Sequence, residues 1–158
     1  MQLPDQELIE DFANYFETQH NFSPLTSKIY SYMLVGETPE GTTFDALVEV
    51  FKVSKSSVSN SLNFLTQLRY IEYYSKMDQR KRLYRIAQSA TLIRLEKIHE
   101  ILKLEKKLSE RFLKFLVDKT ANSDDLRILK SSIYVDHLDK AVDQLAETIH
   151  KLKSVKEN

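Results

Sequence analysis

The sequence lacks cysteine altogether, and glycine and proline are scarce in it. With no cysteine among 158 residues, disulfide bonds and thiolate metal sites are excluded. Two glycines and three prolines suit a chain that is mostly helical. No apolar run approaches the ~18 residues of a membrane-spanning helix, and the acidic start is unlike a signal peptide. A cytoplasmic protein without a membrane partner is therefore expected.

Recognisable catalytic and metal-binding patterns are also missing. There is no glycine-rich phosphate loop and no nucleophile elbow, and the four histidines are scattered. The nearest ligand-like cluster is Asp136-His137 with Asp139, whose spacing does not converge on one ion. We expect neither an enzyme nor a bound metal or other cofactor.

Charge is balanced over the whole chain but strongly segregated along it. Lysine and arginine number 23, as do aspartate and glutamate. Between Lys52 and Arg85, however, eight basic residues stand against two acidic ones, so the rest of the chain carries the opposite surplus. Segregation of this kind favours a polyanionic partner for the basic segment, although a solvated basic loop would show the same surplus.

Helical spacing of apolar residues predicts four helices before residue 70. Asp5 is placed to cap the first, and Ser23-Pro24 or Thr26 begins the second. Their aromatic residues are expected to form core, with a ligand pocket as the alternative. Thr43 and Ser54 are placed to cap a short third helix and a longer fourth one. The fourth helix is expected to bury the following residues: Val58, Leu62, Leu65 and Leu68.

The opposite side of the fourth helix is polar and contains no acidic residue. Asparagine and glutamine can pair bidentately with adenine, serine can serve donors or acceptors in the groove, and a cation at the helix start suits a phosphate. An ordinary solvated face would more often show glutamate and lysine pairs. The candidate DNA-reading residues are Lys55, Ser56, Ser59, Asn60, Asn63 and Gln67.

A basic β-hairpin is predicted directly after this helix. Residues 70–75 and 81–86 are β-prone, and 76–79 form the turn. Its tip presents Arg80, Lys81 and Arg82, which can reach a neighbouring minor groove or its phosphates. Asp78 is expected to pair with Arg80. An exposed hairpin kept soluble by charge is the alternative.

At these residues the sequence resembles the MarR family of winged-helix transcriptional regulators, and particularly its GbsR-like branch. The matching segments are Ser54-Lys55-Ser56-Ser57-Val58-Ser59-Asn60 with Leu62 and Leu65, Tyr70-Ile71-Glu72, Arg80-Lys81 with Tyr84, and the Asp78-Gln79-Arg80 tip. The resemblance implies a homodimer on near-palindromic promoter DNA, often with affinity altered by a small-molecule effector. Where family members often carry glycine, this chain has Lys52 and Arg69, which cost ~1 kcal/mol or somewhat more in left-handed backbone.

Two long helices are predicted after the hairpin, over residues 91–119 and from Ser123 onward. Apolar residues of the second recur in steps of three and four, a heptad seam suited to helix packing. The seam residues, taken as dimerisation residues, are Val135, Leu138, Val142, Leu145, Ile149 and Leu152. Packing against the 91–119 helix of the same chain is the alternative, and both can hold in a four-helix bundle.

Together these features predict a mainly α protein with a winged helix-turn-helix. Its regions are N-terminal helices at 1–36, the DNA-binding domain with its small β-hairpin wing at 37–89, and long dimerisation helices at 90–158. The expected function is sequence-specific binding of double-stranded DNA as a homodimeric transcriptional repressor. A winged helix used for protein–protein assembly is the competing interpretation.

Overall fold

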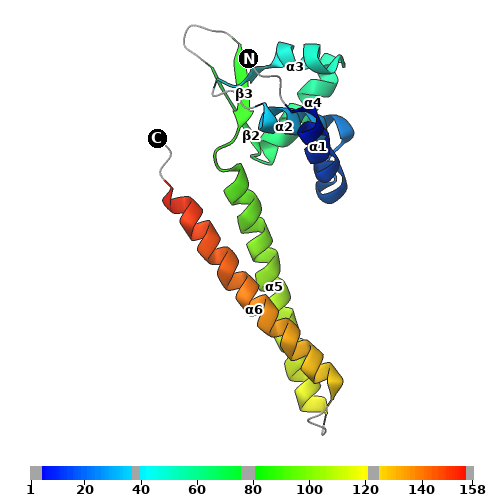
Figure 1. The fold of residues 1–158 in the computed structure, drawn as a ribbon, viewed down its shortest axis with the longest axis vertical. Helices are drawn as coiled ribbons and strands as arrows, with labels where there is room; N and C mark the ends of the chain where they lie inside the picture. The colour runs from blue at the N-terminus through cyan, green and yellow to red at the C-terminus, as the bar shows by residue number, and fades with distance from the viewer. Residues whose placement is uncertain (1–4, 37–39, 76–80, 121–124, 156–158) are drawn as a thin grey trace. The chain divides into compact units, whose positions relative to one another are not determined.

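The computed structural model describes residues 5–36, 40–75, 81–120 and 125–155, which form two compact units, Met1–Ala90 and Thr91–Asn158. Helices dominate both units (Figure 1). The helices and strands of the first unit are α1 (Gln6–His20), α2 (Pro24–Val35), β1 (Thr42–Thr43), α3 (Phe44–Phe51), α4 (Lys55–Gln67), β2 (Ile71–Ser75) and β3 (Arg82–Ile86). The second unit consists of α5 (Ala90–Lys119) and α6 (Leu126–Ser154).

Capping residues begin the first three helices where the sequence places them. The Asp5 carboxylate accepts a hydrogen bond from the Leu8 N–H at 3.1 Å, and the Ser23 hydroxyl accepts one from the Thr26 N–H at 3.3 Å. The Thr43 hydroxyl does the same for Ala46 at 3.2 Å. Each cap satisfies an N–H that has no partner within its helix, so the helix starts are confirmed.

The sheet has three antiparallel strands in the order β1-β3-β2, one strand more than the predicted hairpin. Thr42 and Thr43 of β1 pair with Tyr84 and Leu83 along the edge of β3 that does not pair with β2. Gly41 leads into this short strand with φ +72°, and a Cβ there would lie 2.6 Å from the Tyr84 carbonyl oxygen. Glycine is therefore required where the chain approaches β3.

The core of the first unit is built from α1, α2, α3, α4 and the start of β2. Its largest fully buried side chains include Phe16, Ile29, Leu47, Leu62 and Leu65. Phe16 packs edge-on against Tyr30 with ring centroids 4.8 Å apart, so these two aromatic residues form core, as expected, whereas Tyr15 of α1 is 45% exposed. Leu68 is the exception to the predicted inner face: α4 ends at Gln67, and Leu68, its C-cap, is 37% exposed.

The second unit is an antiparallel helical hairpin, with α5 and α6 side by side (Figure 1). Asp125 caps α6 by accepting from the Arg127 N–H at 2.8 Å. Ion pairs join the two helices, Lys153 to Glu96 at 2.5 Å and Lys106 to Asp139. Across the described residues of both units, no helix is long and apolar enough to cross a membrane.

Candidate nucleic-acid interface

Helix α4 is held in place by its cap and by the turn that precedes it. The Ser54 hydroxyl accepts a hydrogen bond from the Ser57 N–H at 3.2 Å. The turn begins at Lys52, whose left-handed backbone, φ 51°, ends α3. These two features turn the chain from α3 into α4. Lys52 therefore has the left-handed backbone in which a residue other than glycine is strained by ~1 kcal/mol or somewhat more.

The inner side of α4 is anchored in the core. Val58, Leu62 and Leu65 are at most 1% exposed. A buried hydrogen bond from the Thr26 hydroxyl to the Ser61 hydroxyl, 2.9 Å long, ties α4 to α2. Apolar packing and this buried hydrogen bond therefore determine which side of α4 is buried and which side is exposed. The polar pair was not anticipated, because its residues lie 35 positions apart.

The outer side of α4 carries the six predicted reading residues. Five are exposed and Ser59 is half-buried; the exposed ones are Lys55, Ser56, Asn60, Asn63 and Gln67. No residue of α4 is acidic, so the face offers amide and hydroxyl groups with one cation near its start. Such a face can hydrogen-bond base edges without repelling phosphates.

An exposed aromatic residue flanks this face. Phe64 is 41% exposed and meets Phe22, from the loop between α1 and α2, edge-on at 5.5 Å. The reading residues themselves include no apolar side chain. Phe64 thus extends the core toward the surface at the side of the helix.

Two of the three cations predicted at the tip of the wing are described, and each is held by a neighbour. Lys81 is exposed and donates to the Asp45 carboxylate of α3 at 2.8 Å. The Arg82 guanidinium lies 4.6 Å from the Tyr73 ring centroid, a cation–π contact across the hairpin. The third predicted wing residue, Arg80, and its expected pair with Asp78 lie outside the described residues.

The Asp45 carboxyl is the titrating group of this region whose pKa is shifted. Its hydrogen bond and charge attraction to the Lys81 ammonium hold the pKa below the ordinary 3.8. A lowered pKa means that the ion pair is present above it and is lost as the pH falls through it. Lys81 and Asp45 therefore stay paired near neutral pH, which sequence analysis missed because the two lie 36 residues apart.

Part of the basic surplus is neutralised within the sheet. The Arg85 side chain is half-buried and pairs with Glu72 on β2 at 2.7 Å, with its guanidinium 5.0 Å from the Tyr74 ring centroid. Arg69, by contrast, is exposed just after α4, with left-handed backbone at φ 58°. Lys52 is equally exposed before α4. The exposed cations thus bracket the reading face at both ends.

Comparison with known proteins gives one finding, about the fold. No family model and no curated protein matches the sequence. A solved crystal structure described as a transcriptional regulator covers 94% of this chain and 97% of its own, at 18% identity and a TM-score of 0.57. The two chains share a fold. The mainly helical winged helix-turn-helix fold predicted from sequence is confirmed.

The predicted dimerisation seam on α6 lies against α5 of the same chain. Leu138 and Ile149 are buried, Val135, Val142 and Leu145 are half-buried, and Leu152 is 38% exposed. The intrachain alternative therefore accounts for their burial, and their role between subunits stays a prediction.

The Asp136, His137 and Asp139 cluster is engaged in surface contacts. Asp136 pairs with Lys140 at 2.5 Å, and Asp139 with Lys106. The part of the chain that the structure describes contains no group of three histidine or acidic residues placed to hold a metal ion.

Proposed function

We propose that this chain is a sequence-specific double-stranded DNA-binding transcriptional regulator of the MarR type, GbsR-like branch. It acts as a homodimeric repressor on a near-palindromic operator, and its effector is a small molecule. The observation that carries the proposal is the exposed, acid-free polar face of α4, positioned by a cap and a buried core. The regulator fold shared with a solved structure supports it.

In this proposal α4 lies in the major groove and the wing contacts the adjoining backbone. Asn60 lies in the middle of the exposed face, where its amide can pair bidentately with an adenine edge. Lys55, in the first turn of α4, and the exposed Lys52 and Arg69 bind phosphates on either side. Arg82 adds affinity that does not depend on sequence.

The test is fluorescence anisotropy with the DNA immediately upstream of this protein's own gene, against scrambled DNA, over a salt series. A preference of ~10³ or more for the native fragment establishes a specific regulator. Equal, steeply salt-dependent binding to both fragments establishes a DNA-binding protein with another operator. No binding even at low salt favours the protein-assembly alternative.

The variant Asn60→Ala tests the reading face. Removing a bidentate base contact costs about 1–3 kcal/mol of discrimination, so the preference for specific DNA should fall roughly 5- to 150-fold. Binding to scrambled DNA should hardly change. An unchanged ratio of specific to scrambled affinity would show that α4 does not read bases through this face.

A further inference from the structure

A pocket of ≈ 470 Å³ lies within the first unit, between α4 and the loop that joins α1 to α2. It is here called the α4 pocket. The loop contributes Asn21 and Ser23, α2 contributes its first turn, and α4 contributes Asn60, Ser61 and Phe64 among others. Because Asn60 is also a predicted DNA-reading residue, the pocket adjoins the candidate nucleic-acid interface. Its volume is that of an ordinary small-molecule site, about 300–1,000 Å³.

Three hydroxyl groups that line the α4 pocket form a chain of hydrogen bonds with one direction. The Thr26 hydroxyl donates its single proton to the Ser61 oxygen at 2.9 Å, so it must accept in its 2.8 Å bond with Ser23. Ser61, only 5% exposed, ends this chain, and its own proton has no acceptor among the described residues. A buried donor without an acceptor is costly, so this proton is available to an acceptor atom in the pocket.

Two asparagine side chains reach the same pocket from different elements. Asn21 ends α1 with left-handed backbone, φ 53°, which glycine adopts equally well, so the fold does not require its amide. Asn60 comes from α4, and both residues are exposed. Each amide has a donor and an acceptor to offer. A molecule that satisfies this lining must therefore present donors and acceptors together.

Apolar groups complete the lining, and no charge is present. Leu25 and Phe64 are the apolar members, and the edge-on contact with Phe22 at 5.5 Å holds the Phe64 ring. All eight lining residues are uncharged, although 29% of the chain is charged. A bound ion would find no opposite charge here. The lining therefore fits an uncharged molecule with polar edges and an apolar face.

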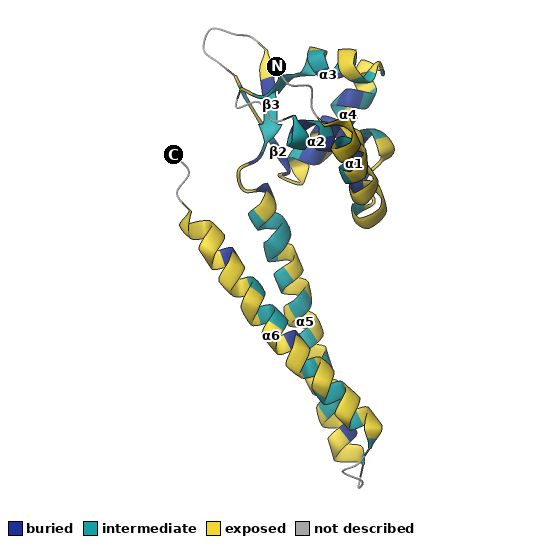
Figure 2. Cartoon of the chain, in the orientation of Figure 1, coloured by how far each residue is buried: buried dark blue, intermediate teal, exposed yellow. Residues whose placement is uncertain are grey.

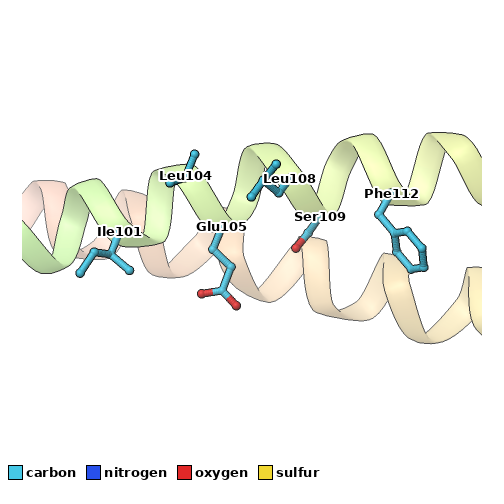
Figure 3. A pocket seen from close by; sticks show the side chains of 6 residues that line it. All are labelled: Ile101, Leu104, Glu105, Leu108, Ser109 and Phe112. Atoms are coloured by element: carbon cyan, nitrogen blue, oxygen red, sulfur yellow. The ribbon is translucent and has the colours of Figure 1, made fainter. Parts of the chain in front are cut away.

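The second unit offers a hollow of different chemistry along α5 (Figure 3). One helix alone lines it, with Glu105 and Ser109 as its polar residues. It lies on an exposed side of α5, whereas another side, at Leu95, Leu102 and Leu116, is half-buried or buried. Most of both helices is exposed (Figure 2). The more than half exposed apolar residues of this hollow are Ile101, Leu104, Leu108 and Phe112. Polar groups from separate elements thus converge in the α4 pocket but not here.

We propose that the α4 pocket binds an uncharged polyhydroxylated molecule of about monosaccharide size. An oxygen of this sugar accepts from Ser61, the two asparagine amides bond neighbouring hydroxyl groups, and the apolar face of the ring lies against Phe64. Because the Asn60 amide cannot bond a sugar and an adenine at once, the bound sugar and bound DNA exclude each other. This exclusion rests on the proposed function and makes the sugar its effector, whereas sugar binding by itself does not depend on DNA.

Saturation-transfer NMR on the full chain without DNA tests the pocket. The neutral probes are D-glucose, D-galactose, D-mannose, D-ribose and myo-inositol, and glucose 6-phosphate is the charged counterpart of the first. At least one neutral probe should receive saturation from the protein at roughly 10 mM, a concentration that reveals millimolar dissociation constants. No transfer to any neutral probe, or tighter binding of glucose 6-phosphate than of every neutral probe, overturns the proposal.

Asparagine variants locate the binding of whichever neutral probe binds best. Asn21→Gly keeps the left-handed backbone and removes one amide, and Asn60→Ala removes the other. Each should weaken sugar binding roughly 2- to 12-fold, as expected for one lost hydrogen bond. Asn63→Ala is the matched control and should keep the native affinity, because Asn63 is exposed on α4 but does not line the pocket. Native affinity in both Asn21→Gly and Asn60→Ala would place the sugar elsewhere and overturn the proposal.

Fluorescence anisotropy with the upstream DNA fragment tests the exclusion. Sugar at ten times its dissociation constant should raise the apparent dissociation constant for DNA at least ~10-fold. Unchanged DNA affinity under these conditions overturns the exclusion. The two proposals fail separately: a chain that binds sugar but no DNA retains the pocket and removes the proposed function, and a chain that binds DNA but no sugar does the reverse.

Discussion

At the scale of single residues, the exposed cations around α4 differ in what holds them. Lys52 and Arg69 occupy left-handed backbone, where a side chain with a Cβ is strained. Lys81 is paired with Asp45, and Arg82 lies over Tyr73. In the proposed function, the contribution of each cation to DNA binding therefore depends on a neighbour or on backbone strain.

Lys52→Gly should stabilise the protein while weakening its binding to DNA. Glycine removes left-handed strain of ~1 kcal/mol, so the free energy of unfolding in urea should rise by up to that amount. Asn21→Gly is the control, since Asn21 has φ 53° but asparagine tolerates this conformation, and little change is expected. A loss of stability in Lys52→Gly would show that its side chain makes a stabilising contact.

Asp45→Asn should strengthen binding to all DNA sequences alike. The substitution removes the charged partner of the Lys81 ammonium and takes away a negative charge next to the wing. If Lys81 then contacts a phosphate, the slope of log affinity against log salt should steepen by about 0.9 per subunit. Glu49→Gln makes the same charge change at another exposed position of α3 and should alter the slope less. Equal effects would mean that only net charge matters.

At the scale of elements, capping residues determine where the helices of the first unit begin. Thr43 and Ser54 begin α3 and α4, and neither helix needs a contact from a distant residue to start there. The sheet is different, because β1 exists only through pairing with β3, about 40 residues away.

Ser54→Ala should cost about 1 kcal/mol of stability, because the Ser57 N–H loses its acceptor at the start of α4. The loss should appear as a lower urea midpoint in a circular dichroism titration. Ser56→Ala, in the same first turn but without a contact to backbone N–H, should change the midpoint by less than half as much. Equal losses in both variants would assign the effect to hydroxyl–hydroxyl contacts.

At the scale of the whole molecule, a neutral chain concentrates its basic surplus in one unit. Residues 52–85 carry most of the exposed cations near α4, and the rest of the chain is acidic on balance. Affinity for DNA should therefore depend on salt through the first unit alone.

Arg82→Ala should flatten the slope of log affinity against log salt by about 0.9 per subunit, because one phosphate would no longer be neutralised. The ratio of specific to scrambled affinity should stay the same, because a phosphate contact carries no base information. Lys107→Ala removes the same charge from an exposed position of α5 and should leave the slope unchanged. A flatter slope in Lys107→Ala would extend the DNA-binding surface to the second unit.

The sequence alone determined the features that depend on neighbours within one helical turn. Helix starts at Asp5, Ser23, Thr43 and Ser54, the inner and outer sides of α4 and the two long helices all follow from caps and periodicity. These interactions join residues two to four positions apart, so they can be read directly from the order of residues.

Only the tertiary structure decided which surfaces meet. It added β1 to the sheet, paired Lys81 with Asp45 and placed the α6 seam against α5 of the same chain. It also divided the apolar residues of α5 into a covered stripe and a free one. Periodicity shows that a side is apolar but not what covers it, because burial depends on residues far away in the chain or in another copy.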